Sequence, residues 1–279
     1  MISNTIVLDM VGKAIEEDFR TGDVTAALLD SGKIGHAKVI TREDMVLCGT
    51  SFVDEVFKAI SPLIKTNWHG NDGDGFSSGD VVLYITGPEA SILTGERIAL
   101  NFLQTLSATA TETAKLVSFL EGTNAKLLDT RKTIPLWRAA QKYAVTCGGG
   151  LNHRMGLYDA FLIKENHILS CGSITLAVTK AKDSSELPII VEVENFSQLI
   201  ETLGLGIDRI MLDNFSVVDC AKAVQLTNGK VPLEVSGNIT ADNIRQYAMT
   251  GVDFISSGAT TKNIHAIDLS LRLSERCYV

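Results

Sequence analysis

The first part of the chain mixes helical and strand patterns of apolar residues. Helical spacing predicts helices over residues 6–19 and 52–60, and alternation predicts strands over 38–47 and 81–86. The order helix, strand, helix, strand favours an α/β sandwich. Residues 94–121 are rich in helix-forming residues and predict one or two long helices that lead into the next region.

The second part of the chain has a different rhythm, in which short apolar runs alternate with segments of helix length. Apolar strands that alternate with helices indicate a parallel sheet covered by helices. Polar or glycine residues follow each run at once, which is typical of the catalytic edge of a (β/α) barrel. The runs are residues 126–128, 160–163, 189–191, 209–212, 232–235 and 254–256. An open doubly wound sheet is the alternative, but no G-x-G-x-x-G follows the first run.

Composition narrows the class of protein. With 279 residues, 45% of them hydrophobic, the chain can form one or two globular domains. The net charge of -8 excludes a generally basic nucleic-acid surface. We expect neither a secretory signal nor a membrane span, because no basic segment precedes an apolar run and no apolar run reaches about eighteen residues.

The five cysteines are scattered along the sequence, at residues 48, 147, 171, 220 and 277. Their spacing predicts no metal knuckle or redox pair, and the odd count argues against a disulfide framework. A reducing compartment fits this pattern best, so we predict a cytoplasmic protein.

A cationic segment interrupts this acidic chain. Residues 131–164 contain six Lys or Arg against one acid, Asp159, for a net charge of +5. Arg131, Lys132 and Lys164 directly follow apolar runs whose ends should converge, so we predict that they bind a small polyanion. The other basic residues of the helical stretch, Arg138 and Lys142, are predicted to form a solvated helix face.

A run of glycines precedes a histidine and an arginine within this segment. Gly148–Gly150 lead into His153 and Arg154, and glycine lets the backbone approach a ligand or adopt a positive φ. We predict that His153 donates to a carboxylate, with a plain flexible loop as the alternative. His167 is predicted to be a supporting hydrogen-bonding group rather than a ligand.

Acidic and small residues follow the remaining runs. Glu192, Glu194 and Asp213 stand at two strand ends, and Mg²⁺ together with substrate phosphates would explain inward-facing acids. Zinc is disfavoured there, because neither Cys nor His lies near these acids in the sequence. The last two loops predict a phosphate site, with simple helix caps as the alternative. The residues of these loops are Ser236, Gly237, Asn238, Ser257 and Gly258.

Several segments together resemble quinolinate phosphoribosyltransferase over nearly the whole chain. The most specific is CGGGLNHRMGLYDAFLIKENHI, which spans residues 147–168. The others are EDFRTGDVT (17–25), ERIALNFLQTLSATAT (96–111), DTRKT (129–133), MLDNF (211–215) and EVSGNI (234–239).

The resemblance implies a fold, an assembly and a reaction. The fold is an N-terminal α/β sandwich, residues 1–110 with 266–279 returning to it, joined to an incomplete (β/α) barrel over 111–265. The assembly is a homodimer with shared active sites. The reaction converts quinolinate and phosphoribosyl pyrophosphate into nicotinate mononucleotide, pyrophosphate and CO₂ in NAD synthesis, with Mg²⁺ and no organic cofactor.

The resemblance also assigns roles to residues. Arg131, His153, Arg154 and Lys164 would hold the two carboxylates of quinolinate, and Arg97 would come from the other subunit. Lys132, beside Thr130, would lie between the two substrates, and Glu192 and Asp213 would meet the ribose and Mg²⁺. Ser236, Gly237, Asn238, Ser257 and Gly258 would hold phosphate, and Lys262 would reach the pyrophosphate.

The chain departs from the family pattern at three places. Residues 134–138, IPLWR, stand where the family usually has TPGLR, so the loop after Lys132 is expected to differ in shape. Ile190 replaces a common glutamate, which leaves the roles of Glu192 and Glu194 open, and Lys262 replaces a frequent histidine.

Three other functions compete with this one. A paralogous family associated with molybdenum transport shares the scaffold, although the full set of quinolinate-type cations argues against it. A barrel aldolase would use Lys132 or Lys164 to form a Schiff base. A non-catalytic protein that binds an anionic metabolite is the third.

Overall fold

The computed structural model describes residues 2–30 and 32–274, which form two compact units. One unit contains residues 2–30, 32–112, 139–149 and 264–274, and the other contains 113–138 and 150–263. The predicted boundaries assigned 139–149 to the barrel. They remain a prediction, and the last five residues of the predicted returning segment, 275–279, lie outside the described residues.

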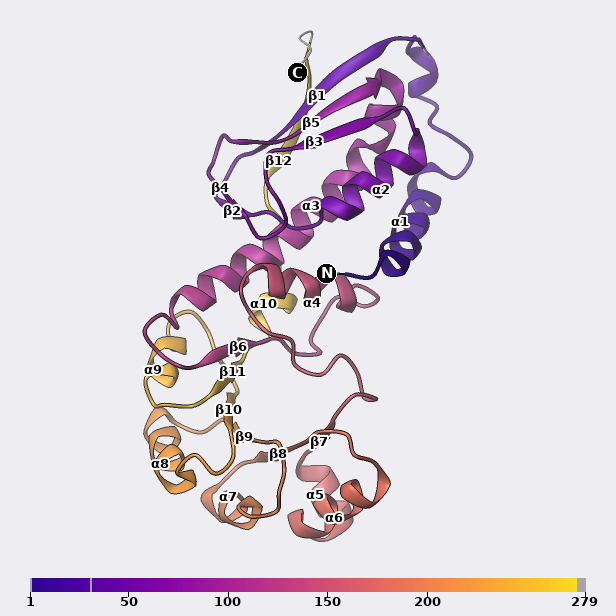
Figure 1. Ribbon diagram of the computed structural model, residues 1–279. Helices are drawn as coiled ribbons and strands as arrows, with labels where there is room; N and C mark the ends of the chain where they lie inside the picture. Colours follow the sequence, from indigo (N-terminus) through magenta and orange to yellow (C-terminus); the bar gives the residue numbers. More distant parts are fainter. Residues whose placement is uncertain (1, 31, 275–279) are drawn as a thin grey trace. The chain divides into compact units, whose positions relative to one another are not determined.

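The first unit is built on an antiparallel sheet with the strand order β12-β1-β5-β3 (Figure 1). A pair of short strands, β2 and β4, forms a second small sheet. The strands are β1 (Ile34–Thr41), β2 (Met45–Val46), β3 (Lys65–Trp68), β4 (Gly75–Phe76), β5 (Val81–Pro88) and β12 (Leu269–Ser274). The helices are α1 (Asn4–Phe19), the 3₁₀ turn η1 (Ala26–Leu28), α2 (Thr50–Ile60), α3 (Glu89–Ser118) and α4 (Arg138–Cys147).

Helices α2 and α3 cover one face of this sheet. The apolar face of α2 buries Phe52, Val56 and Phe57, as expected from residues spaced one turn apart. The ring of Phe52 stacks on that of Phe102 from α3, with centroids 5.0 Å apart. Burial of these aromatic rings stabilises the unit through the apolar area removed from water.

The predicted strand over 38–47 is divided in the structure. The hydroxyl of Thr41 donates to the carbonyl of Glu43 at 2.6 Å, and this local turn separates β1 from β2. Strand β3 was not predicted, because Lys65–Trp68 contains no repeating apolar residue and only its pairing with β5 makes it a strand.

The second unit contains a six-stranded parallel sheet with the order β6-β11-β10-β9-β8-β7. Helices α5–α9 lie along one face of this curved sheet (Figure 1). The strands are β6 (Lys126–Leu128), β7 (Phe161–Ile163), β8 (Ile189–Val193), β9 (Arg209–Asp213), β10 (Leu233–Ser236) and β11 (Phe254–Ser256). The helices are α5 (Glu165–Cys171), α6 (Ile174–Ser184), α7 (Phe196–Thr202), α8 (Val217–Thr227), α9 (Ile244–Ala248) and α10 (Ala259–Lys262).

All six predicted strands are present, and the sheet does not close. Strands β6 and β7 form its two edges, and in the described part of the chain they do not pair with each other. The predicted α/β class, with an incomplete barrel, is therefore confirmed. In residues 2–30 and 32–274, no helix has the length and apolar character needed to cross a membrane.

Alternate residues of the parallel strands face opposite sides of the sheet. Val191, Ile210 and Leu233 belong to the apolar core shared with the helices. The residues that face the other side of the sheet include Glu192, Met211 and Glu234, which are neighbours on β8, β9 and β10. The inner face of the sheet is therefore where polar side chains converge.

The loop after β6 contains a leucine in a strained backbone conformation. The Trp137 amide donates to the Ile134 carbonyl at 3.1 Å, and Leu136 at the third position of this turn has φ 67°. Proline at the second position and positive φ at the third are typical of a type II turn, which favours glycine there. The loop thus keeps the backbone that glycine would adopt.

Replacing Leu136 with glycine is expected to raise the free energy of unfolding by about 0.5 kcal/mol. Left-handed backbone costs a non-glycine residue about 1–2 kcal/mol, and the entropy of glycine offsets about half of that. Leu136 is 89% exposed, so little packing is lost. Urea unfolding measures the change, and the control Leu157→Gly, at an exposed site without positive φ, should lower stability instead. Equal changes in the free energy of unfolding of the two variants would show that the backbone of Leu136 is not strained.

Candidate functional site

A cavity of about 260 Å³ lies at the inner face and carboxyl ends of the parallel strands in the second unit. Eight of the predicted site residues line it: Thr130, Arg131, Lys132, His153, Arg154, Lys164, Glu192 and Ser236. Leu162, Met211 and Ser256 complete the lining.

Two arginines lie close together in this cavity. Burial and the neighbouring charge of Arg131 lower the pKa of Arg154 below its ordinary value. The Arg154 guanidinium donates to the carbonyl of Ala160 at 3.1 Å, which fixes the side chain. Two cations held together against their mutual repulsion form a site that an anion would stabilise.

Lys164 and Glu192 form an ion pair at the rim of the cavity. The Lys164 Nζ lies 2.6 Å from Glu192 Oε2, and Glu192 is buried. Burial raises the pKa of Glu192 above its ordinary value. The ion pair with Lys164 lowers this pKa and the charge of Asp213 raises it, and the net effect is a rise. Glu192 and Asp213 therefore lie near enough to interact. Glu194 follows the end of β8 and is exposed, so only Glu192 faces the cavity.

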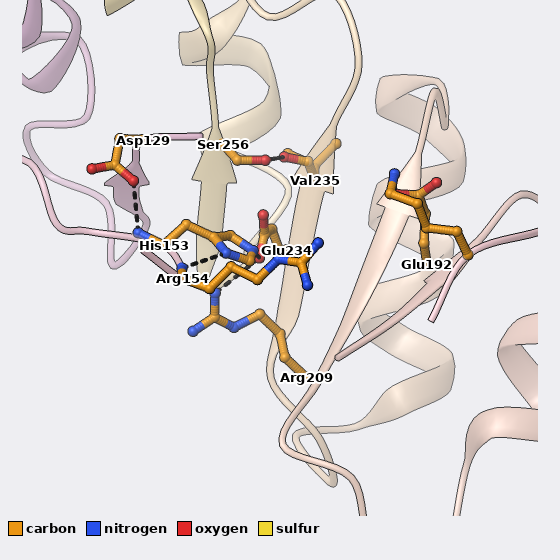
Figure 2. Close-up of polar contacts among 9 residues, drawn as sticks. Asp129, His153, Arg154, Glu192, Arg209, Glu234, Val235 and Ser256 are labelled. Atoms are coloured by element: carbon orange, nitrogen blue, oxygen red, sulfur yellow. Dashed lines mark hydrogen bonds and ion pairs between the residues drawn. The ribbon is translucent and has the colours of Figure 1, made fainter. Parts of the chain in front are cut away.

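His153 belongs to a buried network of polar side chains, part of which Figure 2 shows. Its backbone amide donates to Asp129 Oδ1 at 2.8 Å, and its ring Nε2 lies 3.4 Å from Glu234 Oε2. Arg209 donates to the same Glu234 oxygen at 2.9 Å and stacks over the ring of Phe254. Burial would raise the pKa of Glu234, but its interactions with His153 and Arg209 hold that pKa below the ordinary value.

Replacing Glu234 with glutamine is expected to lower the free energy of unfolding by about 2 kcal/mol, because hydrogen bonds to a buried charge are worth about 1.5–3 kcal/mol. Glutamine keeps the volume but removes the charge that pairs with Arg209. Urea unfolding of this variant and of Glu186→Gln, an exposed control in the same unit, measures the difference. An equal loss in both would show that the buried network contributes nothing.

The predicted phosphate loops lie beside the cavity, with glycines at close approaches. Gly237 has φ 105°, and a Cβ there would stand 2.2 Å from Asn214 Oδ1. Asn238 follows with φ 49°. A Cβ at Gly258 would lie 3.1 Å from Lys132 Cδ, so glycine lets the lysine pack against this loop.

Ser256, the last residue of β11, and Ser257, which follows it, have different surroundings. The Ser257 hydroxyl is buried and donates to the Ile239 carbonyl at 3.1 Å, whereas Ser256 lines the cavity. Ser256, Glu234 and Arg209 were missed because they lie within the apolar runs, whereas candidates were sought among the residues that follow each run. Strand parity, counted from Glu192, is the signal that finds Glu234 on the same face.

The remaining predicted residues lie outside this cavity lining. Asp213 ends β9, and its Oδ2 accepts from Asn214 at 2.9 Å. Lys262 is exposed at the end of α10. Arg97 is exposed on α3 in the first unit, where it lines a different cavity of about 310 Å³ with Asp18 and Asp23.

The predicted solvated face of Arg138 and Lys142 is wrong. Arg138 donates to Thr133 Oγ1 and to the Met155 carbonyl and so ties the site loops together. Lys142 is fully buried in α4. Both were misplaced because sequence spacing does not show which helix face packs. His167 does act as a supporting group: its Nδ1 accepts from the Lys164 amide at 3.0 Å.

Two family models cover most of the chain. The N-terminal domain of quinolinate phosphoribosyl transferase matches residues 23–107, and the C-terminal domain matches residues 109–272. The chain belongs to the quinolinate phosphoribosyl transferase family. The resemblance carried by the sequence motifs is thereby confirmed.

Curated and solved members of the quinolinate phosphoribosyl transferase family match at nearly full length. A probable nicotinate-nucleotide pyrophosphorylase (carboxylating) of Bacillus subtilis is 37% identical and covers 94% of each chain. The corresponding enzyme of Mycobacterium leprae is 38% identical and covers 95% of this chain and 96% of its own. The structure of nicotinate-nucleotide pyrophosphorylase from Francisella tularensis is 49% identical, with a TM-score of 0.96 over 98% of both chains.

Proposed function

We propose that this protein transfers the phosphoribosyl group of phosphoribosyl pyrophosphate to quinolinate, with loss of CO₂, in NAD biosynthesis. The products are nicotinate mononucleotide and pyrophosphate. The observation that carries the proposal is the gathering of Arg131, His153, Arg154 and Lys164 around one small cavity in a chain of this family.

Charge explains why the cavity suits quinolinate. Quinolinate carries two carboxylates on a pyridine ring, and Arg131 and Arg154 supply forked donors that match carboxylate geometry. His153, held by Glu234 on the inner face of the sheet, adds a further polar contact. Because the other substrate is also an anion, cations fixed in advance remove the repulsion between the two and orient the ring nitrogen.

Glu192 and Lys132 have roles in the transfer step. As pyrophosphate leaves, positive character develops on the ribose, and the carboxylate of Glu192 can stabilise it. The ion pair with Lys164 at 2.6 Å holds Glu192 in place. Lys132, packed beside Gly258, lies where it can contact both substrates. The positive charge of the quaternary ring nitrogen then stabilises the electron pair left on the adjacent ring carbon as CO₂ departs. A proton from solvent takes the place of the lost carboxylate, so no organic cofactor is needed.

The acidic residues fit a magnesium ion that arrives with the substrate. Glu192 lies next to the end of β8 and Asp213 ends β9, the neighbouring strand. Two carboxylate oxygens with substrate phosphates form a donor set that Mg²⁺ prefers. When bound, the ion would neutralise charge on the leaving pyrophosphate. Phosphate oxygens would lie along Ser236, Gly237, Asn238, Ser257 and Gly258, and Lys262 would reach the pyrophosphate.

The rival aldolase is disfavoured by the ion pair of Lys164. A Schiff-base lysine must have its amine free to attack a carbonyl, whereas the Lys164 Nζ is held 2.6 Å from Glu192 Oε2. The rival role in molybdenum transport is disfavoured by the close match to nicotinate-nucleotide pyrophosphorylases along the full chain.

A direct assay tests the function. Purified protein is mixed with quinolinate, phosphoribosyl pyrophosphate and Mg²⁺, and nicotinate mononucleotide and CO₂ are measured. Formation of both in equal amounts, dependent on each substrate, supports the proposal. Binding of quinolinate without product would identify a non-catalytic binding protein and overturn it.

A homodimer with shared active sites belongs to the same proposal, since Arg97 matches a family position that would act in the site of the other subunit. Its exposure on α3 is consistent with that role. Arg97→Ala should be inactive alone but regain activity when mixed with Arg154→Ala, since one of the hybrid sites is intact. If the two variants are shown to exchange subunits and the mixture stays inactive, the active sites are not shared between subunits. Within the same proposal, the four cysteines of residues 2–30 and 32–274 are free thiols, which agrees with a reducing, cytoplasmic location.

A further inference from the structure

The first unit brings together two cysteines and an aspartate that are far apart in the sequence. The Sγ atoms of Cys48 and Cys147 and a carboxylate oxygen of Asp72 all lie within 4.8 Å of one another. We propose that these three residues bind a thiophilic divalent cation such as Zn²⁺. Sequence spacing predicted no such cysteine pair, because the pairing depends on α4 packing into this unit.

The loops that carry Cys48 and Asp72 are fixed by backbone hydrogen bonds. The Gly73 amide donates to the Leu47 carbonyl at 2.8 Å, and the Leu47 amide donates to the Asp74 carbonyl at 2.9 Å. The Cys48 amide donates to Ser107 Oγ at 3.0 Å. The donor atoms are therefore held in place before any ligand binds, as a metal site requires.

The carboxylate of Asp72 is oriented by three donors. Its Oδ1 accepts from the amides of Gly49 and Thr50, at 3.0 and 3.1 Å, at the start of α2. Its Oδ2 accepts from the hydroxyl of Tyr143 at 2.8 Å. Each carboxylate oxygen has two acceptor positions, so Oδ1 is fully used and Oδ2 keeps one for a cation. Tyr143 stands one turn before Cys147 on α4 and supports the ligand from behind.

The two thiols and the carboxylate of Asp72 meet at one point of the first unit. Among the residues that the structure describes, no Lys, Arg or His forms a salt bridge with Asp72. A bound cation would allow both thiols to ionise.

The donor set selects the class of metal. Two thiolates and one carboxylate suit Zn²⁺, which takes four ligands in a tetrahedron, with water in the open position. Mg²⁺ and Ca²⁺ prefer oxygen donors alone. Binding balances as one dication taken up and two thiol protons released. Cys48 is fully buried, whereas Cys147 and Asp72 are half-buried and leave a path for the ion.

The site would anchor the end of α4. Cys147 is the last residue of that helix, and the chain continues through Gly148–Gly150 toward His153 and Arg154. Bound metal would therefore hold residues 139–149 on the first unit at the start of the glycine segment.

Cobalt titration of the full-length, reduced and metal-free protein tests the proposal without any substrate. Co²⁺ should produce a thiolate-to-cobalt charge-transfer band and tetrahedral visible bands that saturate at one equivalent and vanish on addition of Zn²⁺. Cys48→Ser and Cys147→Ser should abolish the charge-transfer band, and Asp72→Asn should weaken binding at least tenfold. Cys171→Ser is the matched control and should behave as the unchanged protein does.

Three outcomes would overturn the metal site. The first is the absence of a charge-transfer band in the unchanged protein, and the second is a band that survives in both serine variants. The third is a Cys48–Cys147 disulfide found by peptide mapping under the reducing conditions of the titration. Circular dichroism confirms that each variant is folded. Because the readout is spectroscopic, failure here is distinguishable from absence of transferase activity.

Discussion

Replacing Arg154 with alanine is expected to lower kcat/KM for quinolinate by about a hundredfold, mainly through a higher KM. Truncating one partner of a desolvated charge pair costs about 2–5 kcal/mol, and 1.4 kcal/mol corresponds to a factor of ten. The loss follows from leaving a substrate carboxylate in the cavity without its forked donor. Steady-state kinetics with quinolinate varied at saturating phosphoribosyl pyrophosphate measure it.

A surface arginine provides the control for this prediction. Arg42 in the first unit pairs only loosely with Asp268, at 3.8 Å, and its side chain is half exposed. Arg42→Ala should leave KM within about twofold, since exposed ion pairs contribute about 0–1 kcal/mol. If Arg154→Ala leaves the KM for quinolinate unchanged, then Arg154 does not hold a substrate carboxylate.

Replacing Glu192 with glutamine is expected to lower kcat by about 10²–10³, with little change in the KM for quinolinate. Removing one preorganised group aimed at developing charge typically has an effect of that size. Glutamine keeps the shape of the side chain but cannot stabilise positive character on the ribose. Single-turnover measurements of nicotinate mononucleotide separate this step from product release.

The same strand supplies the control for Glu192. Glu194 is exposed beyond the end of β8, so Glu194→Gln should keep full activity.

The raised pKa of Glu192 adds a pH test, because lower pH protonates this carboxylate and removes its charge. Activity of the unchanged enzyme should fall on the acid side at a higher pH than an ordinary glutamate would cause. In Glu192→Gln this acid limb should disappear, and its persistence would assign the limb to another group.

The apolar runs predicted the six parallel strands because a strand covered by helices must be apolar on its packed face. The polar residues after the runs predicted the cavity, since the carboxyl ends of parallel strands meet at one edge. Eight of the cavity residues were identified in this way. Strand β3 escaped prediction, because Lys65–Trp68 gains its conformation from pairing with β5 rather than from its own residues.

The inner face of the sheet shows why the rest of the site could not be predicted. Glu234 lies within an apolar run, and its burial is tolerated only because Arg209 and His153 reach the same carboxylate oxygen. These three residues are far apart in the chain. Their contact depends on the register that places β9 beside β10 and on the loop that returns from α4.

By itself, the sequence determined the strand and helix rhythm, the cationic character of the site and the family. These properties are local: they depend on residue type and spacing along the chain. Only the tertiary structure decided that Lys142 is buried, that Glu192 rather than Glu194 faces the cavity, and that Cys48 meets Cys147 beside Asp72. Contacts between distant segments follow from which faces pack together, and residue spacing along the chain does not carry that information.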